Sequence, residues 1–106
     1  MREAPITKDE LKGVIRDWGE GRMTSKALHD WCEENYWPGQ WEPGPDEPLH
    51  VGRAMAVILN EFELSDPASF SPKRFGSALS FLETAEADFE RAQQEFLENC
   101  FQEVSP

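Results

Sequence analysis

The sequence predicts an all-α domain, a compact antiparallel bundle of four to five helices. Apolar residues recur at three- and four-residue spacing along most of the chain, helix formers dominate outside one proline-rich segment, and no useful stretch alternates apolar with polar residues. Strand content should be near zero. The chain has 106 residues, enough for one compact domain and too short for two. We therefore expect one helical domain over residues 1–106, with residues 1–6 frayed.

The first helix is expected over residues 8–19. Thr7 and Glu10 have the spacing of a capping box, in which a threonine hydroxyl and a glutamate side chain satisfy backbone N–H groups at the helix start. Apolar side chains then follow at helical spacing. Gly19 and Gly21 are expected to end the helix, because glycine adopts the left-handed cap conformation without steric cost.

The second helix is expected over residues 25–36, with Thr24 as N-cap and Pro38 as its stop. Residues 37–48 then contain four of the eight prolines, a density that excludes helix and central strand. Trp37 and Trp41 lie in this loop and favour an ordered functional segment over a proline-stiffened strap. They either fold back over the bundle or anchor a partner, since tryptophan is enriched at interface hot spots.

Asp46 is the expected cap of a third helix over residues 47–63. Ser71-Pro72 then opens a helix, and apolar spacing continues to Cys100. One unbroken helix would be roughly 30 residues and about 45 Å long, and half of it would overhang the bundle. Either a homodimer covers the overhang through residues 85–103, or the chain breaks near Glu83-Thr84 into helices over 72–83 and 85–103. We favour the break and a monomer, because it gives one compact five-helix domain.

Charge excludes several classes of function. Lys and Arg total 10 against 21 Asp and Glu, a formal net charge of −11. Nucleic-acid backbones and anionic membranes are both bound by clustered cations, so neither is an expected partner. No apolar run approaches a membrane span and no signal-peptide core follows Met1. We expect a cytoplasmic protein in which Cys32 and Cys100 are buried, reduced and inert.

A metal centre and an active site are not expected. His29 and Glu33 are four residues apart with Asp30 between them, but they fall off the apolar face, and no metal-binding motif accompanies them. A chance pair on a solvated face is the better interpretation. Serines lack a nucleophile elbow, no phosphate loop is present, and with so many carboxylates pairing alone nominates no acid or base. We expect no enzyme and no cofactor.

Acidic residues are the remaining signal. No basic residue occurs between Lys26 and Arg53, and the residues expected to bind a basic partner fall in that interval: Glu33, Glu34, Trp37, Trp41, Glu42, Asp46 and Glu47. A second acidic stretch, residues 83–103, holds seven acids against Arg91 alone. The competing interpretation of both is a solvated surface that maintains solubility. Lys73 and Arg74 place positive charge at the start of a helix, where the helix dipole disfavours it, and the sequence pattern offers no reason for this pair.

Four segments of the sequence together resemble a recurrent bacterial pattern. Residues 17–24 (DWGEGRMT) end a helix in W-x-E-G, and residues 29–34 (HDWCEE) carry W-x-E-E on the next; residues 64–67 (LSDP) and 78–82 (ALSFL) resemble its continuation. The pattern is similar to small helical immunity proteins of the colicin D immunity type, over about two thirds of the chain. The resemblance implies a non-enzymatic inhibitor of a cognate toxin, often a basic nuclease. The proline-rich loop and the acidic C-terminal stretch depart from it, so no interface residue is transferred.

Alternative functions stay open. One is a helical regulatory or adaptor protein without a toxin partner. Another is an acidic mimic of nucleic acid that inhibits a DNA-binding enzyme. A toxin gene immediately upstream favours immunity, whereas a phage cassette favours the mimic.

Overall fold

Five α-helices carry most of the chain in the computed structural model, which describes residues 5–35, 41, 42, 44 and 46–101. The helices are α1 (Lys8–Gly19), α2 (Ser25–Asn35), α3 (Leu49–Leu64), α4 (Phe75–Leu82) and α5 (Phe89–Asn99). Single 3-10 turns, η1 (Pro67–Ser69), η2 (Pro72–Arg74) and η3 (Glu86–Asp88), lie in the connections after α3 and α4. None of the described helices is long and apolar enough to cross a membrane.

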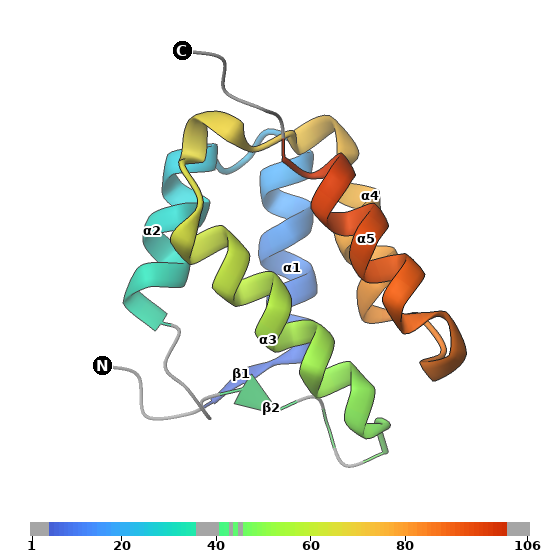
Figure 1. Cartoon of the computed structure of the whole chain (residues 1–106). Coiled ribbons are helices and arrows are strands. Elements are labelled where there is room, and N and C mark those ends of the chain that lie inside the picture. The colour runs from blue at the N-terminus through green and yellow to red at the C-terminus, as the bar shows by residue number, and fades with distance from the viewer. Residues whose placement is uncertain (1–4, 36–40, 43, 45, 102–106) are drawn as a thin grey trace.

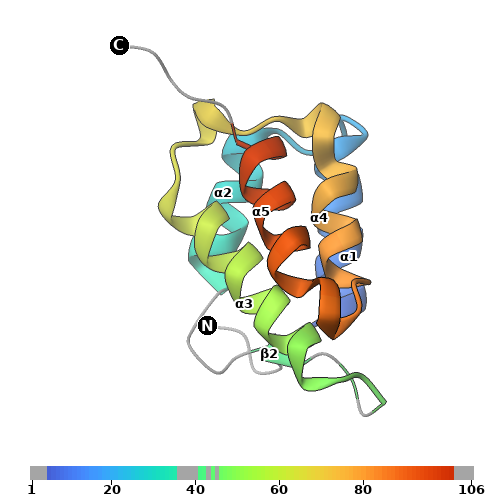
Figure 2. The same cartoon turned by 45° about the vertical axis from the view of Figure 1, so that its right-hand side comes forward.

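The helices pack around an aromatic core. Figures 1 and 2 show α5 beside α4, α4 on α1, and α2 beside α3, and these pairs are in contact. The rings of Trp18 and Phe62 meet edge-on at 5.2 Å between centroids, and Phe62 meets Phe96 in the same way at 5.7 Å. Edge-to-face contacts between fully buried rings add to the stabilisation from burial itself. The helical spacing of apolar residues in the sequence therefore corresponds to this core.

Local capping signals confirm two helix starts and correct a third. The Thr7 hydroxyl accepts a hydrogen bond from the Glu10 backbone N–H at 3.1 Å, and the Thr24 hydroxyl accepts one from Ala27 at 3.0 Å. The prediction that Asp46 caps α3 is wrong, because α3 begins only after Pro48, whose ψ of 157° is extended. A residue that precedes proline is disfavoured in helical conformation, which keeps residue 47 out of the helix.

The break between the last two helices is confirmed. Helix α4 ends at Leu82 and α5 begins at Phe89. The turn is held by a hydrogen bond of 2.7 Å between His50 Nε2 and the Thr84 carbonyl oxygen, so Nε2 carries the proton. The fold-back buries Phe89 and Phe96 within one chain. The apolar surface that would have required a second copy over residues 85–103 is thus already covered.

A short strand pair departs from the expected absence of strands. Strand β1 (Ile6–Thr7) lies parallel to β2 (Trp41–Glu42), with Ile6 opposite Trp41 and Thr7 opposite Glu42. Residues 41 and 42 fall between the prolines at 38 and 43, so both retain the N–H that pairing needs. Ile6 is fully buried, so fraying of residues 1–6 is wrong at that position; residues 1–4 lie outside the described residues.

Candidate protein-binding surface

An acidic hollow lies beside the strand pair. It has a volume of about 460 Å³ and is lined by Thr7, Lys8, Asp9, Glu42, Gly44, Asp46 and Glu47, which together we call the acidic hollow. Four carboxylates face one ammonium there, so the formal charge is negative. Three of the seven expected binding residues, Glu42, Asp46 and Glu47, are brought together in it. Glu42 and Asp46 are exposed, and neither forms an ion pair within the described part of the chain.

Lys8 fixes one wall of the acidic hollow. Its Nζ donates to Glu47 Oε1 at 2.9 Å and to Glu83 Oε2 at 3.2 Å, although the residue is only 7% exposed. Lys12 donates to the second oxygen of Glu83 at 2.8 Å. The expectation that this acidic segment has no compensating cation is therefore wrong for Glu47. The Lys8–Glu47 hydrogen bond joins the start of α1 to the segment before α3, and the Lys8–Glu83 hydrogen bond joins it to the end of α4.

The pKa values in this ion cluster follow from its geometry. Burial lowers the pKa of Lys8, but hydrogen bonds to Glu47 and Glu83 outweigh it, and the net pKa lies above the ordinary value of 10.5. The hydrogen bond from Lys12, followed by that from Lys8, lowers the pKa of Glu83 below its ordinary 4.5 despite some desolvation. Lys8 and Glu83 are therefore both charged at neutral pH.

Of the two tryptophans in the proline-rich segment, Trp41 is among the described residues and Trp37 is not. Trp41 is half-buried in β2 and packs against the hydrophobic core, opposite the fully buried Ile6. Its ring therefore supports the fold. Trp37 lies outside the described residues.

Glu33 and Glu34 are exposed on the last turn of α2. Figures 1 and 2 place that end of α2 and the strand β2 at the same end of the molecule. Neither residue lines the acidic hollow, so the structure does not join them to Glu42, Asp46 and Glu47 in one site.

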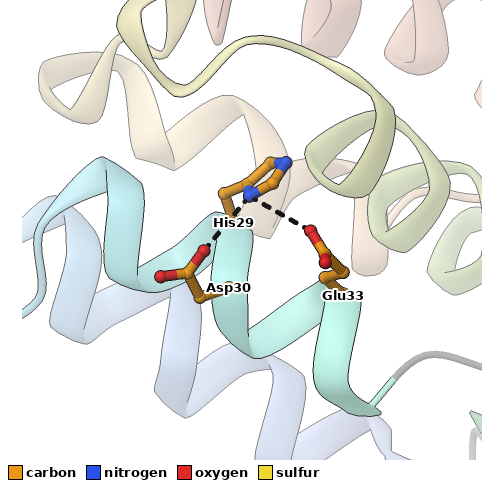
Figure 3. A group of neighbouring side chains, drawn as sticks. All are labelled: His29, Asp30 and Glu33. Carbon is orange, nitrogen blue, oxygen red and sulfur yellow. Dashed lines mark hydrogen bonds and ion pairs between the residues drawn. The ribbon is translucent and has the colours of Figure 1, made fainter.

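Glu33 instead belongs to a small cluster on α2, shown in Figure 3. His29 Nδ1 lies 3.4 Å from Asp30 Oδ1 and 3.8 Å from Glu33 Oε2, and the potential ligand atoms all lie within 4.8 Å of one another. Lys26 Nζ approaches the other oxygen of Asp30 at 2.8 Å, which with the His29 contact lowers the pKa of Asp30. Its side chains are of the types that bind a divalent cation, but the Lys26 ammonium already neutralises part of the negative charge through its ion pair with Asp30. Our expectation stays that no metal binds.

The competing acidic stretch lies mainly on α5 and the turn before it. Glu86, Glu90 and Glu95 are exposed. Asp88 is paired with Arg91 at 3.2 Å, whereas Glu98 accepts a hydrogen bond from Gln94 at 3.0 Å. Residue 103 lies outside the described residues. This surface is convenient for comparison because it is also acidic and comes from different elements.

Both cysteines are buried free thiols, as the sequence predicted. Desolvation raises the pKa of each to about 12. At Cys32 the nearby charge of Glu63 adds to the effect. A thiolate is the nucleophilic form, so neither residue is activated at neutral pH.

Sequence reasoning missed two charged residues of the acidic hollow, Lys8 and Asp9. They belong to the first turn of α1, more than thirty residues before Glu42, and no local pattern links them to that segment. Comparison of the chain with protein-family models, with curated proteins and with solved structures finds no match. Function is therefore inferred from the residues alone.

Proposed function

We propose that the protein is a non-enzymatic acidic binding protein, an immunity protein that neutralises a cognate basic, nuclease-type bacterial toxin. In this proposal a compact antiparallel helical bundle carries the proline-rich segment between α2 and α3 as its binding surface. The observation that supports it most is the acidic hollow, where Glu42 and Asp46 are exposed and lack ion pairs within the described residues. Unpaired exposed carboxylates remain available to cations on a partner.

Two contacts anchor this surface to the fold, which favours tight capture. The β1–β2 pair holds Glu42 from one side, and the hydrogen bond from Lys8 to Glu47 holds the segment from the other. A preorganised surface loses less conformational entropy on binding. Glu42 and Asp46 would chiefly accelerate association with a positively charged partner, because long-range charge complementarity acts on encounter. On a basic nuclease bound in this way, the cations that contact nucleic-acid phosphates would be covered and unable to bind the substrate.

Calorimetry and a cleavage assay test the proposal together. The probes are the nuclease domain of a colicin D-type toxin and the product of any toxin gene adjacent to this one. A one-to-one complex that abolishes cleavage is the expected result. Binding without inhibition would favour an adaptor, and inhibition confined to a DNA-binding enzyme would favour the nucleic-acid mimic. Absence of binding to any basic toxin would overturn the immunity proposal.

A further inference from the structure

Helix α3 begins with an apolar side chain that the fold leaves in water. Leu49 is its first residue and is 92% exposed, and Pro48 before it is exposed as well. Among the described residues, Leu64 at the other end of the same helix is the other large apolar side chain that is exposed, at 73%. A single exposed leucine is common on protein surfaces, so its surroundings decide whether it has a role.

Leu49 lies next to the acidic hollow in the chain. Glu47, which lines that hollow, is two residues before it, and Figures 1 and 2 place the start of α3 at the same end of the molecule as β2. Lys8 and Glu47 also line a second hollow, of about 340 Å³, together with Pro48. The exposed apolar pair Pro48–Leu49 therefore continues the surface that the acidic hollow begins. Leu64 lacks this setting, because the two leucines lie at opposite ends of a helix of 16 residues, about 22 Å apart along its axis.

The backbone around Leu49 is fixed before a partner arrives. The ring of Pro48 holds its φ, which is −63°, and its carbonyl accepts a hydrogen bond from the Val51 N–H at 3.1 Å. Val51 is only 3% exposed, so the first turn of α3 is anchored in the protein. On the other side of Pro48, Glu47 accepts the hydrogen bond from Lys8 at 2.9 Å. Binding through Leu49 therefore has to order only its own side chain, which lowers the entropic cost of association.

We propose that Leu49 is the apolar anchor of the partner interface and enters an apolar pocket bordered by lysine or arginine side chains on a basic protein. The inference rests on the proposed function and adds to it an apolar requirement on the partner. The exposed carboxylates of Glu42 and Asp46 contact the cations, and Leu49 fills the pocket. Charge then governs how fast the partner associates, whereas burial of Leu49 governs how slowly it dissociates.

A second copy of this chain fits the surface less well than a basic partner does. Each copy has a net charge of −11, and a contact through Leu49 of both copies would bring two acidic hollows together. Arg53 lies one turn after Leu49 in α3, but its guanidinium is over the Phe89 ring, at 4.8 Å from the centroid. Its charge is therefore placed against α5 and does not line the acidic hollow.

Dissociation kinetics of the toxin complex test the anchor. The full chain is bound to the basic toxin domain that forms a one-to-one complex with it in calorimetry, and dissociation is followed after addition of excess unlabelled protein. Leu49→Ala should dissociate at least about tenfold faster, because three apolar carbon atoms lose their contact, while its association rate changes less than about twofold. Leu49→Met keeps an apolar side chain of similar size and should dissociate within about threefold of wild type. Both variants should keep the wild-type melting temperature, because the side chain is exposed.

Leu64→Ala is the matched control, because it removes the same atoms from an exposed leucine at the far end of α3; it should dissociate within about twofold of wild type. Unchanged dissociation of Leu49→Ala, or equal acceleration by Leu49→Ala and Leu64→Ala, would overturn the anchor and leave the proposed function standing. Absence of a complex with the wild-type protein would overturn the proposed function and the anchor with it. A wild-type dimer in sedimentation equilibrium that Leu49→Ala dissociates would assign Leu49 to a second copy and also overturn the proposal.

Discussion

Replacing Gly19 by alanine should destabilise the protein, although alanine is the better helix former. Gly19 is the last residue of α1, and an added Cβ would lie 2.0 Å from Cγ of Phe75 and 2.3 and 2.5 Å from its two Cδ atoms. The sequence suggested that both Gly19 and Gly21 serve the left-handed conformation. Only Gly21, with φ of +87°, does so; Gly19 is needed because the Phe75 ring packs on its Cα.

The expected change in the free energy of unfolding for Gly19→Ala follows from two opposing effects, helix propensity and overpacking. Alanine in place of glycine inside a helix stabilises by about 0.8–1 kcal/mol, and less at the final residue. Overpacking a filled contact costs about 1–3 kcal/mol, and the upper half applies here because the whole aromatic ring must move. We therefore expect Gly19→Ala to lower the free energy of unfolding by about 1–2 kcal/mol.

Urea denaturation followed by tryptophan fluorescence measures the change, since the buried Trp18 reports on unfolding. Gly13→Ala is the matched control, because nothing lies within 4 Å of its added Cβ in the same helix; it should stabilise by about 0.5–1 kcal/mol. In a Phe75→Ala background the penalty at position 19 should disappear. If Gly19→Ala stabilised the wild-type protein as much as Gly13→Ala does, the close packing of Phe75 on α1 would be wrong.

Four further predictions concern ionisable groups. Lys8→Met should cost about 1–3 kcal/mol in thermal unfolding, because two carboxylates lose the ammonium they share; an unchanged melting temperature would contradict this. The pKa of Glu83 is lower in the folded state, so its ion pairs stabilise the folded protein above about pH 4.5, and this stabilisation is lost as the pH falls through the folded-state pKa. Glu83→Gln should therefore make the free energy of unfolding depend less on pH in the acid range. Cys32 and Cys100 have pKa values raised from 9.0 to about 12, so stability should fall as the pH rises between these values, and a thiol reagent should react only on unfolding. EDTA should leave the melting temperature unchanged, and a large drop would indicate a metal at His29.

Much of the fold could be predicted because its signals are local or depend on chain length. The Thr7 and Thr24 caps need only a hydroxyl three residues before a free N–H. The break after Leu82 followed from geometry, since a single helix to Cys100 would have left Phe89 and Phe96 uncovered. The start of α3 differs from the prediction because the restriction that Pro48 imposes on the residue before it outweighs the general preference for Asp at caps.

The candidate site was predictable only in part. Glu42, Asp46 and Glu47 are close in sequence, so their gathering in the acidic hollow could be anticipated. The contribution of Lys8 could not, because its partners Glu47 and Glu83 are 39 and 75 residues away and meet it only through packing of α1 against α4 and the strand pair. For Trp41 the composition gave no means to choose between core and interface, and the structure shows that its ring mainly packs on the core.

Capture of a basic partner by the acidic hollow is tested most directly by the association rate with a basic toxin domain. Glu42→Lys/Asp46→Lys reverses two of the exposed charges of the acidic hollow and leaves the Lys8–Glu47 ion pair in place. Glu90→Lys/Glu95→Lys reverses the same amount of charge on α5. Stopped-flow measurements at several salt concentrations should show that the first variant associates at least about tenfold more slowly and with weaker salt dependence, while the second changes little. The opposite order, with the α5 variant slowed and the hollow variant like wild type, would contradict the assignment.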